Sequence, residues 1–141
     1  MKKQRYIVVD DDATNNMICE FTIKRFDRDA EIKKFTMPED ALASIKEEYS
    51  TILEALPTIL FLDVNMPSMT GWEFLDEFLQ LEEWIKDQFT IYILSSSIGD
   101  FTKEAAIYTI IRGFLSKPLK TTNLESIMKE FQELQVYSKI L

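Results

Sequence analysis

The sequence contains no histidine, and its 141 residues include one cysteine, Cys19. The absence of histidine excludes Ser-His-Asp and Cys-His catalysis, and it excludes a phosphohistidine carried by this chain. It also leaves no set of nitrogen and sulfur ligands for a zinc or haem site, and a single thiol cannot form an internal disulfide. A metal ion bound by this protein must therefore be held by oxygen atoms.

Long apolar runs and an excess of positive charge are also missing. The apolar run behind the basic first residues extends from Tyr6 to Val9, which is too short for a signal peptide or a membrane span. Sixteen Lys and Arg residues against 24 Asp and Glu residues give a formal net charge of -8. An acidic chain attracts neither nucleic acid nor anionic lipid. We therefore expect a cytoplasmic protein that binds no nucleic acid and no membrane.

Length and composition indicate one globular domain that spans residues 1–141. A typical domain has about 150 residues, which leaves no room for a second one. Of the residues, 46% are hydrophobic and 28% are charged, a balance that supports one buried core. No internal repeat, low-complexity segment or Pro/Gly-rich linker divides the chain.

Strand-like runs alternate with segments of helical periodicity along the whole chain. The predicted strands cover residues 6–9, 30–35, 58–62, 89–94 and 113–116. The predicted helices cover about 14–26, a segment from residue 38, about 71–86, about 100–111 and a segment that begins at 121 or 122. This alternation predicts an α/β fold in which helices cover both faces of a five-stranded parallel sheet, a doubly wound three-layer sandwich.

The sequence also predicts how some helices begin and which side chains they bury. The candidate N-cap residues of the first helix are Thr14, Asn15 and Asn16. Ile18 belongs to the predicted buried face of this helix, and Gly71 is expected to provide a turn conformation before the third. Met17 and Phe21 flank the buried face, where they either dock a partner helix or pack against neighbouring side chains. The sequence leaves these two interpretations open.

Polar residues follow the predicted strands at the edge where parallel sheets bind their ligands. They are Asp10, Asp11 and Asp12 after the first strand, Asp63 and Asn65 after the third, Ser95 after the fourth and Lys117 after the fifth. Two carboxylates about 5 Å apart repel each other by roughly 3 kcal/mol at an effective dielectric constant near 20. Converging carboxylates therefore need a cation, and ligation by a few oxygen atoms favours Mg²⁺.

The same side chains suit a phosphoryl group. Asp63 is the candidate nucleophile, because a carboxylate can form an acyl phosphate and this one stands alone after a central strand. Asp10 and Asp11 would then hold the metal ion, Lys117 would add a positive charge, and Ser95 would add a hydroxyl donor. Phosphoryl transfer depends mainly on positioning and on charge neutralisation, so no general base is required.

Taken together, these motifs resemble the receiver domain of two-component response regulators. The resemblance runs essentially from end to end. It rests on the segments Val8-Val9-Asp10-Asp11-Asp12, Phe61-Leu62-Asp63-Val64-Asn65-Met66-Pro67, Met69-Thr70-Gly71, Ile93-Leu94-Ser95-Ser96-Ser97 and Gly113-Phe114-Leu115-Ser116-Lys117-Pro118. It implies a flavodoxin-like fold and a stand-alone, single-domain response regulator. Such a protein has no separate output module, so its output must be a changed surface.

The resemblance further implies how the acceptor site is built. By this resemblance, Asp63 accepts a phosphoryl group from a phosphohistidine on a partner histidine kinase or histidine phosphotransfer protein. Mg²⁺ is held by Asp11, Asp63 and the backbone carbonyl of Asn65, with Asp10 acting partly through water. The protein is then a phosphoacceptor that assists its own phosphorylation and dephosphorylation, and not a dedicated enzyme.

The switch residues are likewise implied by the resemblance. Ser95 takes the switch-hydroxyl role, Phe114 the switch-aromatic role and Lys117 the phosphate-contacting role. Many family members have threonine where Ser95 stands and tyrosine where Phe114 stands, so here the hydroxyl is kept but the ring lacks its polar tip. The bond between Lys117 and Pro118 is often cis in the family. The expected responding face, formed by the last two helices and the fifth strand, would bind an unidentified target, a second copy of this chain as a homodimer, or the next protein of a phosphorelay.

Two other functions remain open at this stage. One is a protein-binding module that keeps the fold but acts independently of phosphorylation. The other is a phosphatase that forms an aspartyl phosphate on a similar sheet. Such phosphatases usually carry a second aspartate two residues after the nucleophile, where this chain has Asn65, and a cap domain.

Overall fold

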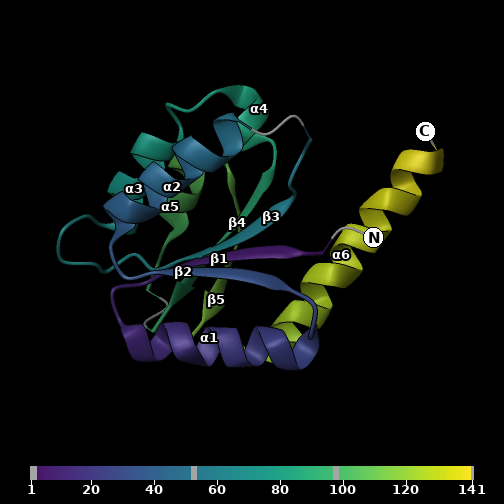
Figure 1. Cartoon of the computed structure of the whole chain (residues 1–141), viewed down its shortest axis with the longest axis horizontal. Helices are drawn as coiled ribbons and strands as arrows, with labels where there is room; N and C mark the ends of the chain where they lie inside the picture. Colours follow the sequence, from purple (N-terminus) through teal and green to yellow (C-terminus); the bar gives the residue numbers. More distant parts are fainter. Residues whose placement is uncertain (1–2, 52–53, 97–98, 141) are drawn as a thin grey trace.

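The computed structural model describes residues 3–51, 54–96 and 99–140, with side chains up to residue 134. Within these ranges, five strands form one parallel sheet in the order β2-β1-β3-β4-β5 (Figure 1). The strands are β1 (Arg5–Val9), β2 (Glu31–Phe35), β3 (Thr58–Leu62), β4 (Phe89–Ser95) and β5 (Ile111–Ser116). This order is the flavodoxin-like one, so the predicted fold class is confirmed. Ser97, the last residue of the fourth-strand motif, lies outside the described ranges.

Helices cover both faces of the sheet (Figure 1). One face carries α1 (Ala13–Phe26) and α6 (Thr121–Ile140). The other face carries α2 (Pro38–Ser50), α3 (Gly71–Phe78), α4 (Glu83–Lys86) and α5 (Thr102–Ile107). In the part of the chain that the structure describes, no helix combines the length and the apolar character that a membrane crossing requires.

The core consists of two apolar layers, one on each face of the sheet. Side chains alternate along a strand, so Ile7 and Val9 of β1 pack in the layer under α2 and α3, whereas Tyr6 and Val8 pack in the layer under α1 and α6. In β3 every residue is buried, as expected for a strand that is covered on both faces. Each fully buried large apolar side chain contributes roughly 1.5–3 kcal/mol to folding, so these layers hold the strands in place.

The predicted third and fourth helices differ from the observed ones. The predicted helix 71–86 is interrupted, because α3 ends at Phe78 and a tight turn precedes α4; in this turn the backbone N–H of Leu81 donates to the carbonyl of Phe78 at 3.0 Å. The predicted helix 100–111 is only the six-residue α5, because Ile111 instead pairs with Ile91 in the sheet. Tertiary packing overrides helix periodicity at both places.

The first helix begins one residue earlier than predicted and has a different N-cap. Asp12 is the N-cap, and its carboxylate accepts hydrogen bonds from the backbone N–H of Thr14 at 2.9 Å and of Asn15 at 3.4 Å. The prediction of Thr14 or an asparagine was wrong because Asp12 is the last extended residue before the helix, and its side chain accepts from the free N–H groups of the first turn.

The face that α1 buries is also rotated from the predicted one. Cys19 and Ile23 are fully buried, but Ile18 is 41% exposed, so its predicted burial was wrong. Met17 and Phe21 are 65% and 68% exposed. This exposure does not support the interpretation that the pair packs against neighbouring side chains, and the docking of a partner helix stays a prediction.

Candidate functional site

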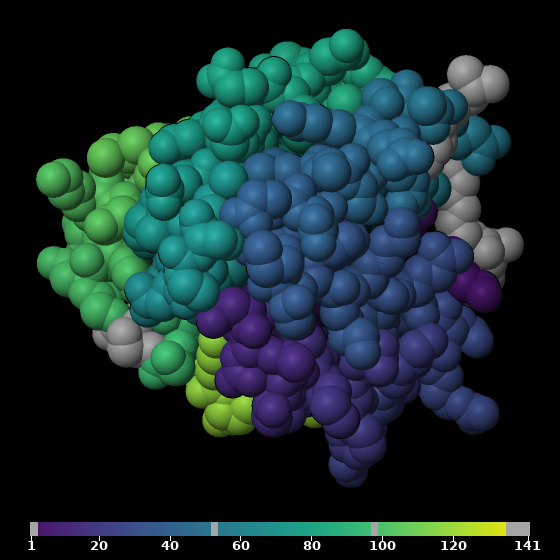
Figure 2. All heavy atoms as spheres, turned by 60° about the vertical axis from the view of Figure 1, so that its left-hand side comes forward, coloured from purple at the N-terminus to yellow at the C-terminus, as the bar shows by residue number. Residues whose placement is uncertain are grey.

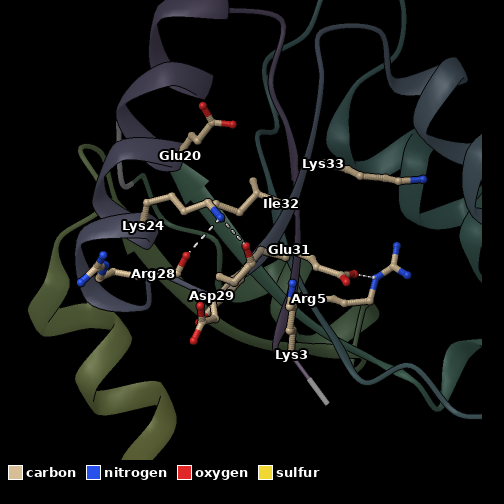
Figure 3. Close-up of a pocket in the computed structure, with 11 residues that line it drawn as sticks. Lys3, Arg5, Glu20, Lys24, Arg28, Asp29, Glu31, Ile32 and Lys33 are labelled. Carbon is tan, nitrogen blue, oxygen red and sulfur yellow. Dashed lines mark hydrogen bonds and ion pairs between the residues drawn. The ribbon is translucent and has the colours of Figure 1, made fainter. Parts of the chain in front are cut away.

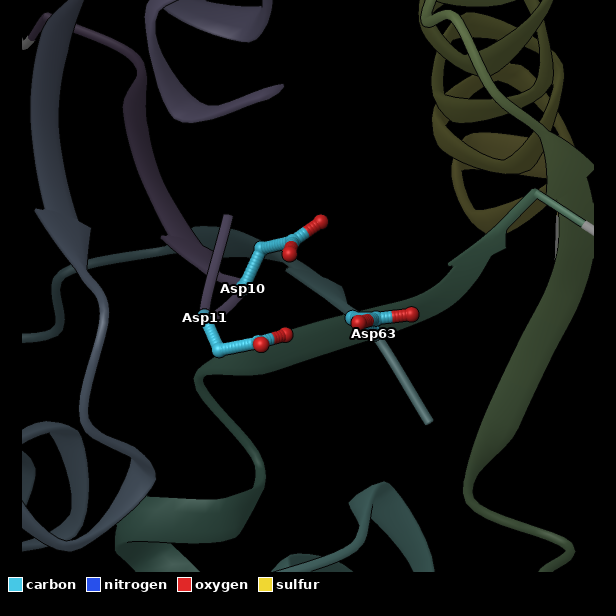
Figure 4. A group of neighbouring side chains, drawn as sticks. All are labelled: Asp10, Asp11 and Asp63. Atoms are coloured by element: carbon cyan, nitrogen blue, oxygen red, sulfur yellow. The ribbon is translucent and has the colours of Figure 1, made fainter. Parts of the chain in front are cut away.

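Three carboxylates converge at the carboxyl edge of the sheet. Asp10 follows β1 and Asp63 follows the neighbouring strand β3; both are buried, whereas Asp11 is exposed. One carboxylate oxygen from each of the three residues lies within 4.8 Å of the others, and all three side chains point to the same side (Figure 4). In the space-filling view of this side, the purple segment after β1 lies beside the teal segment after β3 (Figure 2). The site is therefore open to solvent on the side of Asp11.

The sheet itself positions the two buried carboxylates. The backbone N–H of Asp63 donates to the carbonyl of Val9 at 2.9 Å, and the N–H of Asp10 donates to the carbonyl of Phe35 at 3.0 Å. These bonds continue the parallel hydrogen-bond pattern by one residue beyond the strands. Because Val9, Leu62 and Phe35 are register partners, the residues that follow them reach the edge at the same level.

Lys117 reaches the carboxylates from the end of β5. Its backbone N–H donates to the carbonyl of Ser95 at 2.9 Å, and its peptide bond to Pro118 is cis. The ammonium Nζ lies 2.6 Å from Asp10 Oδ2 and 3.5 Å from Asp63 Oδ1. Burial alone would lower the pKa of Lys117, but the hydrogen bond and charge of Asp10, together with those of Asp63, raise it above its ordinary value. The lysine is therefore cationic at neutral pH.

The carboxylate of Asp63 is incompletely compensated by its surroundings. Burial and the negative charge of Asp10 raise its pKa, and the charge of Lys117 and the backbone N–H groups of Asn65 and Val64 offset this rise only in part. A raised pKa means that the surroundings disfavour the ionised carboxylate. Additional positive charge at the site would therefore stabilise the ionised form of Asp63.

A buried asparagine supports Asp10, a role that sequence reasoning missed. Asn15 Nδ2 donates to Asp10 Oδ2 at 2.7 Å, and the backbone N–H of Asp12 donates to Asp10 Oδ1 at 2.9 Å. Asn16 Nδ2 donates to the backbone carbonyl of Asp10 at 3.0 Å. The sequence does place two asparagines in the first helical turn, directly after the aspartates that follow the first strand. Because a buried amide needs hydrogen-bond partners, this arrangement could have predicted that they bind Asp10.

Gly71 lies against the backbone of Asp63, and its predicted role as a turn former was wrong. No glycine in the described ranges has a positive φ. A Cβ atom at Gly71 would lie 2.5 Å from the carbonyl oxygen of Asp63 and 2.8 Å from Cα of Val64. The N–H of Gly71 donates to the carbonyl of Val64 at 3.0 Å. Glycine is thus required by a close approach of two backbones.

Comparison with known proteins identifies the family. The family model described as the response regulator receiver domain matches residues 6–129, which is most of the chain. The chain belongs to this family. This match confirms the resemblance that the sequence motifs indicated. Members of the family are phosphoacceptors in signalling and not dedicated enzymes.

Solved structures of receiver domains have the same fold. A two-component response regulator from Cytophaga hutchinsonii is 25% identical, with a TM-score of 0.79, over 94% of this chain and 99% of that one. A response regulator receiver protein from Dyadobacter fermentans is 21% identical, with a TM-score of 0.79, over 90% and 96% of the two chains. The chemotaxis protein CheY4 from Vibrio cholerae is 22% identical, with a TM-score of 0.69, over 92% and 98%. Among curated proteins, the comparison finds no significant match.

The remaining predicted residues of this receiver domain lie along β4, β5 and the loop after β3. Ser95 is buried at the end of β4, directly opposite Ser116 in the register with β5. Phe114 is half-buried, and its ring stacks on Phe101 with centroids 5.4 Å apart and planes 15° apart. The side chain of Asn65 is exposed at the rim of the site. The structure thus brings the three carboxylates together, places Lys117 against Asp10 and Asp63, and places Ser95 at the same edge, with Phe114 farther back on β5.

A hollow lies at the opposite edge of the sheet, where the strands begin (Figure 3). Its walls carry charged side chains of both signs. Lys24 Nζ donates to the carbonyl of Ala30 at 2.7 Å, and Arg5 pairs with Glu31 at 3.8 Å. These contacts connect α1 to the residue before β2 and join β1 to β2. The charged side chains of this hollow therefore have a structural role.

Proposed function

We propose that this receiver domain accepts a phosphoryl group on Asp63 and signals through the surface change that follows. The observation that carries the proposal is the buried, incompletely compensated carboxylate of Asp63, with the ammonium of Lys117 3.5 Å away and two further carboxylates beside it. A phosphoryl acceptor requires a nucleophile held in place and positive charge next to the transferred oxygens. Membership of a family of phosphoacceptors supports the same function.

The residues at this edge fit a Mg²⁺ ion. We assign Asp11, Asp63 and the backbone carbonyl of Asn65 as its ligands, with Asp10 acting partly through water. The three carboxylates offer oxygen atoms within 4.8 Å of one another, and exposed Asp11 leaves room for the water ligands that Mg²⁺ retains. When bound, the ion supplies positive charge that offsets the negative charge of the carboxylates and of the phosphoryl oxygens.

The chain's own residues then perform the transfer and read it out. A carboxylate oxygen of Asp63 forms a bond to phosphorus while the bond between phosphorus and the donor imidazole nitrogen breaks, and the electron pair of that bond stays on the nitrogen. Lys117 moves from Asp10 towards the new phosphoryl oxygens, and the hydroxyl of Ser95 donates to one of them. Phe114 turns in response. The transfer needs no general base, because a carboxylate oxygen attacks phosphorus without losing a proton in that step.

The phosphoryl donor must be another protein if it carries phosphohistidine, since this chain has no histidine. We assign the donor role to a histidine kinase or histidine phosphotransfer protein. Met17 and Phe21, which lie one helical turn apart on the exposed face of α1, offer an apolar contact for a helix of that partner. The N-cap of the same helix, Asp12, hydrogen-bonds to Asp10, so a partner docked on α1 would lie at the rim of the site.

Intact-protein mass spectrometry after incubation with acetyl phosphate tests the proposal. We expect a gain of one phosphoryl mass that requires Mg²⁺ and disappears in Asp63→Asn. The matched control Asp29→Asn, an exposed residue in the turn between α1 and β2, should be phosphorylated like wild type. A folded wild-type protein that gains no mass under any of these conditions would contradict the proposal and favour a binding module that acts independently of phosphorylation.

A further inference from the structure

Four aromatic side chains from three segments of the chain form a continuous row beside the site. Tyr108, at the end of α5, stacks on Trp72 of α3 with ring centroids 5.6 Å apart. Trp72 meets Phe101 edge-on at 5.7 Å, and Phe101 stacks on Phe114 of β5 at 5.4 Å. We call these four residues the aromatic row. Ring pairs in these arrangements attract each other beyond the contribution of their buried area.

The aromatic row is connected to the acceptor site at two points. Trp72 directly follows Gly71, which packs against the backbone of Asp63. At the other end of the row, Phe114 lies on β5, the strand that leads to Lys117. The row therefore joins the segment after the phosphoryl acceptor to the strand that immediately precedes Lys117. A movement of the Phe114 ring must change the packing of Phe101, because the two rings are in stacking contact.

The aromatic row also attaches α5 to the rest of the domain. This helix has six residues, none of them buried, so its own side chains contribute little to the core. Phe101 and Tyr108 flank the helix on both sides and contact Trp72, and the hydroxyl of Tyr108 donates to Asp76 of α3 at 2.8 Å. Phe101 and Phe114 also line a surface hollow together with Ala105 of α5. A short, exposed helix held mainly by flanking rings is the kind of element that shifts at low free-energy cost.

We propose that Phe101 is a positioning residue that holds Phe114 against the aromatic row, and that phosphorylation of Asp63 breaks this stack, loosens α5 and changes the surroundings of Trp72. This inference rests on the proposed function and extends it, because it carries the signal to α3 as well as to the face formed by α5, β5 and α6. The aromatic row opposes the switch in the resting protein. Shortening Phe101 therefore favours the activated state.

The test uses Trp72 as its own reporter. The chain has two tryptophans, and Trp84→Phe leaves Trp72 as the only one. Near-ultraviolet circular dichroism and tryptophan emission are recorded before and after addition of Mg²⁺ alone, and then of Mg²⁺ with beryllofluoride, a mimic of the phosphoryl group. Bound beryllofluoride is counted separately by its ¹⁹F resonance. The tryptophan signal thus reports on the aromatic row, and the fluorine signal reports on the site.

Phe101→Leu is the main variant, since it removes the ring but keeps an apolar side chain. We expect its resting Trp72 spectrum to resemble the activated parent, its change on addition of beryllofluoride to be largely lost, and beryllofluoride to bind about two- to tenfold more tightly, the factor that corresponds to one lost ring pair. Phe26→Leu, at a partly buried phenylalanine under the other face of the sheet, should behave like the parent. If Phe101→Leu does not fold, Phe101→Met fills the same space with a flexible chain and is expected to give the same result.

Each outcome separates the two proposals. If Phe101→Leu binds beryllofluoride and shows the same Trp72 change as the parent, the aromatic row carries no signal and the inference is overturned. Bound beryllofluoride in the parent without any change at Trp72 overturns it as well and leaves the proposed function standing. A folded parent that gives no bound ¹⁹F resonance contradicts the proposed function and, with it, the role of the aromatic row.

Discussion

Gly71→Ala is the substitution that most directly tests how the fold positions the acceptor. The added methyl group would lie 2.5 Å from the carbonyl oxygen of Asp63 and 2.8 Å from Cα of Val64. Ordinary contacts of this kind are about 3.5 Å, so the start of α3 must move by roughly 1 Å. Both obstructing atoms belong to the backbone, and no side-chain rotation can relieve the clash.

The cost of this movement follows from the contacts that it disturbs. Overpacking in a tightly packed region typically costs about 1–3 kcal/mol. The same shift strains the 3.0 Å hydrogen bond from the N–H of Gly71 to the carbonyl of Val64, which contributes about 1 kcal/mol. We expect the free energy of unfolding to fall by about 2–4 kcal/mol and Tm to fall by on the order of 10 °C. Phosphorylation by acetyl phosphate should also slow, because the displaced backbone carries Asp63.

Urea unfolding and intact-protein mass spectrometry measure the two effects, and the other glycines provide matched controls. A Cβ atom at Gly99 meets nothing within 4 Å, so Gly99→Ala should change the free energy of unfolding by less than about 1 kcal/mol. A Cβ atom at Gly113 would lie 3.2 Å from the ring of Tyr92, and we expect an intermediate loss. A Gly71→Ala protein as stable as Gly99→Ala would refute the reasoning.

Two further predictions concern groups with shifted pKa values. Burial would raise the pKa of Glu48, but hydrogen bonds and charges from Lys33 and Arg5 outweigh burial and lower it. Stability from a lowered carboxyl pKa is present above the unfolded value of about 4.3 and is lost as the pH falls through the folded value. Glu48→Gln should therefore cost about 1 kcal/mol at pH 7 and clearly less near pH 3. Urea unfolding at both pH values measures this, with exposed Glu47→Gln as the control, and an equal loss at both would contradict it. Burial, and then the charge of Asp10, raise the pKa of Cys19 to about 12. The folded protein should therefore not react with Ellman's reagent at pH 8, whereas the protein unfolded in guanidinium should show one reactive thiol. A rapid reaction of the folded protein would contradict this prediction, because it would show that the thiol is accessible.

The parallel sheet could be predicted because its signal is local. The apolar runs of β3 and β4 stand out from their polar neighbours, and their strict alternation with helical segments leaves few alternatives to a doubly wound fold. The helix ends were predicted less well. The break after Phe78 and the short α5 depend on contacts with residues that are distant in the sequence, such as the pairing of Ile111 with Ile91. The local sequence pattern does not predict those contacts.

The candidate site shows the same division between local and distant information. Asp10, Asp63 and Lys117 were predictable as neighbours, since parallel strands bring their carboxyl ends to one edge. The partnership of Asn15 with Asp10 and the packing of Gly71 on Asp63 were not. Asparagine is typical of helix caps and glycine of turns, so propensity alone pointed to the wrong reason for each residue.

In the proposed function, the position of Lys117 links metal binding to the switch. Three carboxylates and one ammonium leave an excess of negative charge at the edge, and a phosphoryl group on Asp63 would bring about 1.5 to 2 more negative charges. Lys117 lies 2.6 Å from Asp10 Oδ2, closer than to Asp63. If it left Asp10 without replacement, a buried carboxylate would lose its closest cation, which costs several kcal/mol. Under the proposed function, Asp10 would therefore need another positive partner before Lys117 could follow the phosphoryl group. A divalent cation would then be a condition for the movement of Lys117 and, with that of Phe114, for the signal that we propose reaches α3.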